Sequence, residues 1–239
     1  ACEAYESFLD LTPEIAVVTN IEPDHLDHHG TEAHLRQSFV RFLELVAAGG
    51  TIVLCADRAE LRLLPLPAGR RVLWYGAEAS AQVRGVGIET HGRSGSCSLL
   101  VEGRECGKLT IAVPGVHNVV NALGAVAAGL AAGAPVEACA GALAGFAGVD
   151  RRFEVLGEAA GVTVVDDYAH HPTEIAAEIA AARSAFPGRR VVAVFQPHLY
   201  SRTRDLAEGF GEALSAADRV VLTGIYPARE APIPGVSSG

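Results

Sequence analysis

The chain has 239 residues, of which 49% are hydrophobic and 20% charged, and its 28 acidic and 19 basic side chains give a formal net charge of −9. This length and apolar fraction can fill the cores of one large domain or two ordinary ones, so the composition excludes a mainly disordered chain. The sequence also lacks a block of Lys and Arg, and non-specific nucleic-acid binding needs a basic face; we therefore expect no nucleic-acid partner.

Strands and helices alternate from the start of the sequence. The apolar run at residues 15–19 predicts a buried parallel strand. Thr31 and Glu32 then open an amphipathic helix that we expect to close at Gly49 and Gly50. Further strands are predicted at residues 51–55 and 71–75. This order of elements indicates a parallel α/β sheet.

The middle of the chain has a different pattern. Residues 83–113 alternate in polarity and are interrupted by glycines, which predicts a small antiparallel meander. Two Ala-rich helices are predicted at residues 117–132 and 136–146. This stretch carries few charges, but Ala and Gly are weak hydrophobes and Pro135 interrupts the run, so we expect no membrane span.

A second α/β pattern follows a linker at residues 148–152. Its strands and helices are predicted in the order 162–165, 172–186, 190–195, 205–216 and 220–223. We therefore expect two domains: residues 1–150 form an α/β domain with a parallel sheet and the meander, and residues 151–239 form a Rossmann-like α/β domain. The second domain is expected to continue beyond Gly239.

The cysteines and the start of the chain indicate the cellular compartment of the protein. The five cysteines are scattered and include no Cys-x-x-Cys pair, which argues against structural zinc and against a disulfide framework. No signal peptide is visible at Ala1, and because the chain contains no Met we expect it to be a piece of a longer protein. A reduced, cytoplasmic protein is the expectation, and its oligomeric state stays open.

Polar side chains gather after the first predicted strand. Thr19, Asn20, Glu22, Asp24 and His25 follow its carboxyl end, where open α/β sheets place ligands. An imidazole beside carboxylates can form part of a site for Mg²⁺ and, through the ion, for a phosphate. A solvent-exposed loop with helix-capping acids is the alternative interpretation.

Two further groups could bind a nucleotide. Asn118 and Asn121 lie three residues apart on the first turn of a predicted helix, and an amide that both donates and accepts suits the edge of a purine. Helix capping is the alternative role for Asn118. At the linker, a guanidinium of Arg151 or Arg152 can reach a phosphate.

Two polar loops follow strands of the second domain. The first contains Asp167, Tyr168 and His170, and the second contains His198 and Arg202. If both loops leave the same edge of one parallel sheet, their side chains converge, and Arg202 can pair with a carboxylate or a phosphate. A Gly-x-Ser-x-Gly elbow, typical of serine hydrolases, is absent from the sequence.

Taken in order, these segments resemble the Mur ligases, and the resemblance covers essentially the whole chain. Two of them, Asp-Asp-Tyr-x-His-His-Pro and Phe-Gln-Pro-His, are similar to those of the members that add the first amino acid of the peptidoglycan stem. The matching segments are Ala1-Cys2-Glu3-x-x-x-Ser7-Phe8-Leu9, Thr19-Asn20-Ile21-Glu22-Pro23-Asp24-His25-Leu26-Asp27, Pro114-Gly115-x-His117-Asn118-x-x-Asn121-Ala122, Arg151-Arg152-Phe153, Asp166-Asp167-Tyr168-x-His170-His171-Pro172-Thr173-Glu174, Phe195-Gln196-Pro197-His198-x-Tyr200-Ser201-Arg202-Thr203 and Tyr226-Pro227-Ala228-Arg229-Glu230.

The resemblance implies a P-loop-type ATPase domain followed by an amino-acid-binding domain. It also implies a ligase that joins L-alanine to UDP-N-acetylmuramate through an acyl phosphate, with ATP and Mg²⁺ as cofactors. By position, it makes His25 a Mg²⁺ ligand and places Thr19 and Asn20 beside the muramate. It makes Asn118 and Asn121 adenine-binding residues.

In the second domain the resemblance assigns Arg152 to the nucleotide phosphates and Asp167 to the ribose. Four residues are similar to the groups around L-alanine and the reaction intermediate: Tyr168, His170, His198 and Arg202. The catalytic residues that it implies are His25, Arg152, His170 and His198.

The sequence also departs from the family pattern. The UDP-sugar domain and the Gly-rich phosphate loop are missing, and a metal-binding Glu is expected one position before Ala1, so we expect little activity from this chain alone. Leu199 stands where some relatives have a basic residue. Two alternatives remain open: a ligase that recycles a tripeptide onto the same sugar nucleotide, and a nucleotide-binding module without catalysis.

Overall fold

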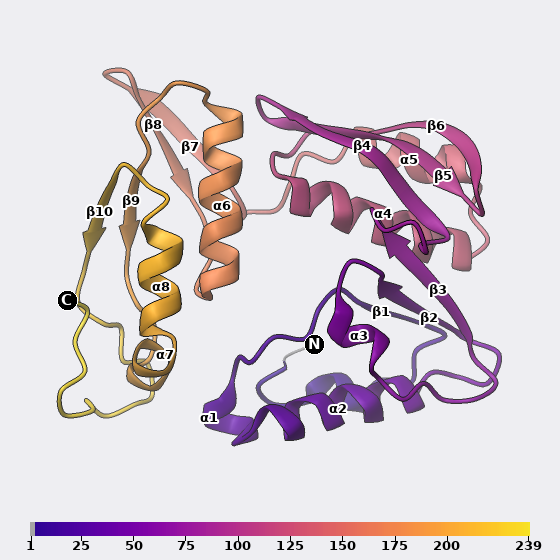
Figure 1. The fold of residues 1–239 in the computed structure, drawn as a ribbon, viewed down its shortest axis with the longest axis horizontal. Helices are drawn as coiled ribbons and strands as arrows, with labels where there is room; N and C mark the ends of the chain where they lie inside the picture. Colours follow the sequence, from indigo (N-terminus) through magenta and orange to yellow (C-terminus); the bar gives the residue numbers. More distant parts are fainter. Residues whose placement is uncertain (1–2) are drawn as a thin grey trace. The chain divides into compact units, whose positions relative to one another are not determined.

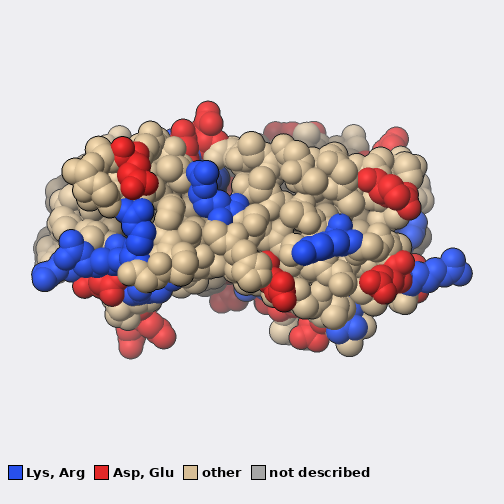
Figure 2. Space-filling model, turned by 90° about the horizontal axis from the view of Figure 1, so that it is seen from above, with Lys and Arg blue, Asp and Glu red and all other residues tan. Residues whose placement is uncertain are grey.

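The computed structural model describes residues 3–239, so Ala1 and Cys2 of the first matching segment lie outside the described residues. The chain forms two compact units (Figure 1). The first consists of residues up to 89, 96–111 and 117–145, and the second of residues 90–95, 112–116 and 146–239. The face drawn in Figure 2 carries small groups of basic and acidic side chains, several of them adjacent to one another, among uncharged surface.

A six-stranded sheet organises the first unit, with the strands in chain order from β1 to β6. Strands β1, β2 and β3 are parallel, and all five residues of β2 are buried, as the apolar runs predict. Two-residue turns join β4 to β5 and β5 to β6, which confirms the predicted meander. The strands are β1 (Ile15–Val18), β2 (Thr51–Cys55), β3 (Arg71–Gly76), β4 (Val83–His91), β5 (Ser94–Val101) and β6 (Arg104–Ile111).

The main helix of this unit begins where the sequence predicts. Thr31 caps α2 (Glu32–Glu44) by accepting a hydrogen bond from the backbone N–H of His34, and the helix buries Leu35, Phe39 and Leu43. It ends at Glu44, before the glycine pair that we expected to close it. The other helices are η1 (Ser7–Asp10), α1 (Leu26–His29), α3 (Ala59–Arg62), α4 (Val116–Ala131) and α5 (Val136–Ala144).

The Ala-rich segment forms α4 and α5, close to the predicted bounds. From residue 3 onward, no helix is both long and apolar enough to cross a bilayer.

The close approach of the Asp57 side chain requires a glycine at position 76, at the end of β3. The φ of Gly76 is 143°, and a Cβ at this position would overlap the Asp57 carboxylate, which accepts hydrogen bonds from the backbone N–H groups of Ala77 and Glu78 at 2.9 Å. We expect Gly76→Ala to lower the free energy of unfolding by about 1–3 kcal/mol in urea titrations, because it adds strain and displaces this carboxylate.

Gly103→Ala is the matched control, because Gly103 also has a positive φ, 78°, but faces open space. We expect Gly103→Ala to lower the free energy of unfolding less than Gly76→Ala does. Equal losses in the two variants would show that the contact with Asp57 is unimportant.

The second unit contains two small sheets instead of the single parallel sheet expected. Strand β8 pairs antiparallel with β7, which the sequence did not predict, and β9 pairs parallel with β10. The helix predicted at residues 205–216 forms as α8, with slightly shorter bounds, whereas the short helix α7 lies in residues that were expected to form a loop. In chain order the elements are β7 (Glu154–Ala159), β8 (Val162–Asp166), α6 (Pro172–Ala185), β9 (Val192–Phe195), α7 (Tyr200–Asp205), α8 (Ala207–Leu214) and β10 (Arg219–Leu222).

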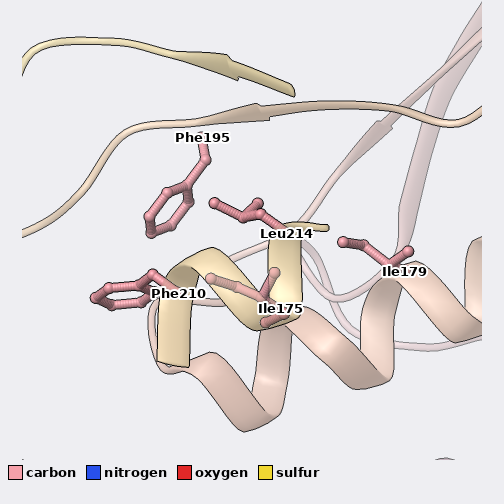
Figure 3. Packing of buried hydrophobic residues seen from close by; sticks show 6 residues of the cluster. Ile175, Ile179, Phe195, Phe210 and Leu214 are labelled. Atoms are coloured by element: carbon pink, nitrogen blue, oxygen red, sulfur yellow. The ribbon is translucent and has the colours of Figure 1, made fainter. Parts of the chain in front are cut away.

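An apolar core joins α6, β9 and α8 of this unit (Figure 3). Ile175 and Ile179 of α6 pack with Phe195 of β9 and with Phe210 and Leu214 of α8, and the two phenyl centroids lie 5.2 Å apart. The burial of these apolar side chains stabilises the packing of α6 against β9 and α8. Both polar loops predicted for the second domain are attached to these elements.

Candidate functional site

The loop after β1, residues 19–25, is held by a chain of side-chain hydrogen bonds. The Thr19 hydroxyl donates to Oδ1 of Asn20 at 2.8 Å, and Nδ2 of Asn20 donates to Oε1 of Glu22 at 3.0 Å. These bonds fix the orientation of the Asn20 amide. Thr19 is exposed and Asn20 half-buried, so the pair can contact a ligand.

His25 ends this loop in a left-handed conformation, with φ 55°, immediately before α1. Its backbone N–H donates to Oδ1 of Asp24 at 2.7 Å, and its Nε2 lies 3.5 Å from Oδ2 of the same carboxylate. An imidazole and a carboxylate are therefore adjacent. They fit part of the coordination shell of a divalent cation, which needs further oxygen ligands from water, a substrate or other residues.

Asn118 and Asn121 lie on the first turns of α4. Asn118 is half-buried and Asn121 exposed, and a separation of three residues puts both amides on one face of the helix. Before the helix, the buried Pro114 and Gly115, the latter with φ 95°, turn the chain into it. The two amides can present donors and acceptors together at the start of α4.

In the second unit the two linker arginines gather around Tyr168. The guanidinium carbons of Arg151 and Arg152 lie 4.6 and 5.9 Å from the centroid of its ring. Arg151 Nε is also 3.6 Å from the Asp166 carboxylate, and Arg152 Nη1 is 3.6 Å from Oε1 of Glu174. The arrangement places two exposed cations beside an exposed phenol, where they can meet an anionic ligand.

Asp167 fastens the linker to the loop after β8. Its Oδ2 accepts a hydrogen bond from the backbone N–H of Phe153, and its Oδ1 accepts one from that of Ala169, both at 2.7 Å. Burial raises the pKa of this carboxyl, although the two backbone donors act in the opposite direction. Asp167 therefore shapes the site in addition to any contact with a ligand.

His170 has a defined proton position in its neutral form. Its Nδ1 lies 2.9 Å from the carbonyl oxygen of Tyr168, and because a carbonyl can only accept, Nδ1 carries the proton. Nε2 is then the basic nitrogen of the ring. The same Nδ1 is 3.4 Å from Glu174, which also accepts hydrogen bonds from the backbone N–H groups of His170 and His171.

His198, in the loop after β9, lies between an arginine and a tyrosine. Arg202 is only 7% exposed, and its Nη1 is 3.3 Å from Nδ1 of His198, which therefore accepts. The imidazole stacks on Tyr226 at a centroid distance of 5.6 Å. Backbone hydrogen bonds from Leu199 to Tyr226 and from Tyr226 to Pro197 hold the two segments together.

The pKa of His198 is lowered, first by burial and then by the positive charges of Arg202 and His170. We expect a ¹H NMR titration to show His198 with a midpoint below the ordinary value of about 6.5, and Arg202→Met to raise that midpoint. The pKa of His198 is lower in the folded chain than in the unfolded chain, so on acidification the unfolded chain binds the proton at a higher pH. The free energy of unfolding should therefore fall as the pH drops below about 6.5. An unchanged midpoint in Arg202→Met would contradict the assigned interaction.

The structure brings the predicted residues of the second domain together in two groups. Tyr168 contacts His170, at 5.4 Å between the ring centroids, and the guanidinium of Arg152, while Arg202 contacts His198. The sequence alone suggests no role for Glu174 or Tyr226. Both lie within segments that resemble the Mur ligases, and this is the feature of the sequence that could have pointed to them. Of the remaining predicted residues, Thr19, Asn20, His25, Asn118 and Asn121 lie in the first unit.

Two family models match the chain. The model of the Mur ligase middle domain matches residues 3–129, and the model described as Mur ligase, glutamate ligase domain, matches residues 151–235. The first match alone covers more than half of the chain.

Individual relatives agree with the family models. The chain is 46% identical over 239 residues to the UDP-N-acetylmuramate-L-alanine ligase of Salinibacter ruber, covering 100% of this chain and 50% of the relative. It is 48% identical over 242 residues to the enzyme of the same name from an Arthrobacter species, covering 100% of this chain and 51% of the relative. The chain thus spans about half the length of the curated relatives it matches.

Solved structures show the same fold. The UDP-N-acetylmuramate-alanine ligase MurC of Thermotoga maritima matches with a TM-score of 0.76 and 27% identity over 94% of this chain and 49% of that one. The MurF ligase of the same organism, solved in complex with ADP, matches in fold with a TM-score of 0.74 at 21% identity, over 91% of this chain and 50% of that one. The chain belongs to the Mur ligase family.

Proposed function

We propose that the protein carrying this sequence is an ATP-dependent ligase that joins L-alanine to the lactyl carboxylate of UDP-N-acetylmuramate. The observation that carries the proposal is the 46% identity, over the whole chain, to a relative named for this activity. The loops after β1, β8 and β9 support it, because they carry amide, imidazole and guanidinium groups of the kinds that this reaction uses.

The proposed reaction has two chemical steps. The carboxylate of the muramate attacks the γ-phosphorus of ATP, which gives an acyl phosphate and ADP. The amine of L-alanine then attacks the acyl carbon, and the tetrahedral intermediate collapses to the amide and phosphate. Mg²⁺, when bound, offsets the negative charge that accumulates between the nucleotide and the carboxylate.

In this proposal the first unit binds the adenine of ATP, a metal ion and the muramate. Thr19 and Asn20 face the muramate, His25 supplies one metal ligand beside Asp24, and Asn118 and Asn121 bind adenine. We also propose that the domain boundary lies near residue 150. The residues 90–95 and 112–116, which pack with the second unit, still belong to the first domain by sequence.

In the second unit, Arg152 binds the nucleotide phosphates and Asp167 the ribose, while Arg202 and Tyr168 position L-alanine. The amine must lose a proton before it attacks, and in this proposal Nε2 of His170 accepts it; the hydrogen bond of Nδ1 to the Tyr168 carbonyl supports this role, because it leaves the lone pair of the neutral ring on Nε2. His198 accepts from Arg202 at Nδ1, so its Nε2–H can donate to the developing oxyanion.

An assay of ADP release by the full-length protein that carries this sequence, with ATP, Mg²⁺, L-alanine and UDP-N-acetylmuramate, tests the proposal. We expect release only when both the amino acid and the sugar nucleotide are present, as for enzymes of the cytoplasmic steps of peptidoglycan synthesis. ADP release that does not depend on the sugar nucleotide would overturn the proposal. Nucleotide binding without any release would favour the non-catalytic alternative.

The second candidate is a ligase that attaches a tripeptide to the same sugar nucleotide. A murein peptide ligase from Psychrobacter arcticus shares the fold, with a TM-score of 0.60 at 21% identity over 90% of this chain and 50% of that one. The burial of Arg202, at 7% exposure, favours L-alanine, because a buried partner for the substrate carboxylate is more accessible to a small amino acid than to a tripeptide. Replacing L-alanine by a tripeptide in the same assay separates the two functions.

A further inference from the structure

Three side chains of metal-ligating type meet in the first unit, separate from the residues proposed for the ligase reaction. Glu6 immediately precedes η1, His29 ends α1, and His34 lies in the first turn of α2. One ligand atom from each lies within 4.8 Å of the other two, and within the described part of the chain no other three His, Cys, Asp or Glu side chains meet this condition. Glu6 therefore meets two histidines that lie more than 20 residues further along the chain, on the consecutive helices α1 and α2.

Hydrogen bonds already orient both imidazoles. Nε2 of His29 is 3.1 Å from the carbonyl oxygen of Glu3, so in the neutral ring Nε2 carries the proton and Nδ1 carries the lone pair. That Nδ1 lies 4.0 Å from Oε1 of Glu6. His34 donates from Nδ1 to the carbonyl oxygen of His29 at 3.1 Å, which leaves its lone pair on Nε2. In protein metal sites, a ligating histidine typically donates its other ring N–H in this way.

Glu6 supplies the negative charge of the cluster. Its pKa is lowered, chiefly by a hydrogen bond from the Ser38 hydroxyl and further by Arg41, His34 and His29. Arg41 Nη1 lies 4.0 Å from Oε2 of Glu6 and offsets part of this charge. The His29 side chain is only 1% exposed and that of Glu6 27%, whereas His34 is exposed, so an ion can enter from the side of His34.

We propose that Glu6, His29 and His34 bind a divalent metal ion of the zinc class and thereby tie η1, α1 and α2 together. Two imidazole nitrogens and one carboxylate oxygen, with water in the fourth position, form a ligand set that suits Zn²⁺. Mg²⁺ prefers oxygen ligands and holds its waters firmly, so this cluster discriminates against it. The site is therefore different in chemistry from the proposed Mg²⁺ site at His25.

Metal titration of the purified protein without a histidine tag tests this inference. We expect a single Zn²⁺ to bind in calorimetry, Co²⁺ to give the visible absorption of a low-coordinate nitrogen and oxygen site, and Mg²⁺ not to displace either ion. Glu6→Gln and His34→Ala should each weaken Zn²⁺ binding by at least about tenfold. Both substitutions avoid the buried His29, whose replacement would endanger folding.

His28→Ala is the matched control, because His28 is the neighbour of His29 on α1 but its ring packs against Tyr5 at 4.9 Å. It should bind Zn²⁺ as the wild type does. At a free Zn²⁺ concentration about 100 times Kd, Tm should rise by about 5–10 °C in the wild type and in His28→Ala, and much less in Glu6→Gln and His34→Ala.

Two results would overturn the inference. One is Zn²⁺ binding that Glu6→Gln and His34→Ala leave unchanged, which would place the ion on other groups such as the cysteines. The other is Zn²⁺ binding that His25→Ala abolishes and His34→Ala does not, which would place the ion in the loop after β1.

Discussion

Arg202→Met is expected to lower kcat/KM for L-alanine by about 30-fold or more. Arg202 is buried at 7% exposure in α7, and its guanidinium reaches Nδ1 of the neutral His198. A buried guanidinium that pairs with the carboxylate of a substrate contributes about 2–5 kcal/mol, because its removal leaves the carboxylate in the site without a cation. We expect the change mainly in KM for L-alanine, with little change in KM for ATP.

Two further variants define this effect. Arg202→Lys keeps the charge but loses the planar fork of donors, so its kcat/KM should fall between those of the wild type and Arg202→Met. Arg204→Met is the control on the same helix: Arg204 is exposed and hydrogen-bonds Asp205 at 2.7 Å. Equal losses in Arg202→Met and Arg204→Met would show that Arg202 does not bind the amino acid.

His25→Ala is expected to reduce kcat by at least about 100-fold at ordinary Mg²⁺ concentrations. His25 is held against Asp24 by its backbone and ring, and its loss removes a neutral ligand from a site that otherwise consists of oxygen atoms. Because the remaining ligands can still bind Mg²⁺ weakly, raising the Mg²⁺ concentration should restore part of the activity.

The Mg²⁺ dependence of kcat distinguishes this role from a structural one. His91→Ala, which alters an exposed histidine at the end of β4, should keep the wild-type Mg²⁺ dependence. If His25→Ala lost activity with an unchanged Mg²⁺ dependence, the assignment of His25 as a metal ligand would be wrong.

The sequence predicts the parallel part of the fold well, because β2 is buried throughout, β1 buries Ala16 and Val18, and residues 15–18 and 52–55 are uninterrupted apolar runs. It misses β7, whose six residues are half-buried or exposed and show no regular alternation of polarity. Helix α7 is also missed, since its six residues, Tyr200–Asp205, are mostly polar and show no apolar periodicity. Strands β8 and β9 belong to different sheets because β8 pairs with β7, and no local sequence pattern predicts this pairing.

The site is predictable as far as strand ends determine it. Loops after β1, β8 and β9 carry the polar residues that the sequence singles out, because ligands of α/β sheets lie at carboxyl ends of strands. The partners of these residues are not predictable in the same way. Tyr226 stacks on His198 although the two residues are 28 positions apart in the sequence, and Glu6 meets His29 and His34 only through the packing of the N-terminal segment against α1 and α2.

Mass spectrometry of the reaction product tests the central claim most directly. The protein is incubated with ATP, Mg²⁺, UDP-N-acetylmuramate and an equimolar mixture of L-alanine and the stem tripeptide. The proposed function predicts that UDP-N-acetylmuramate gains the mass of one alanyl residue, with one ADP formed for each product molecule. A product that carries the tripeptide, or ADP formation without any amide product, would contradict it.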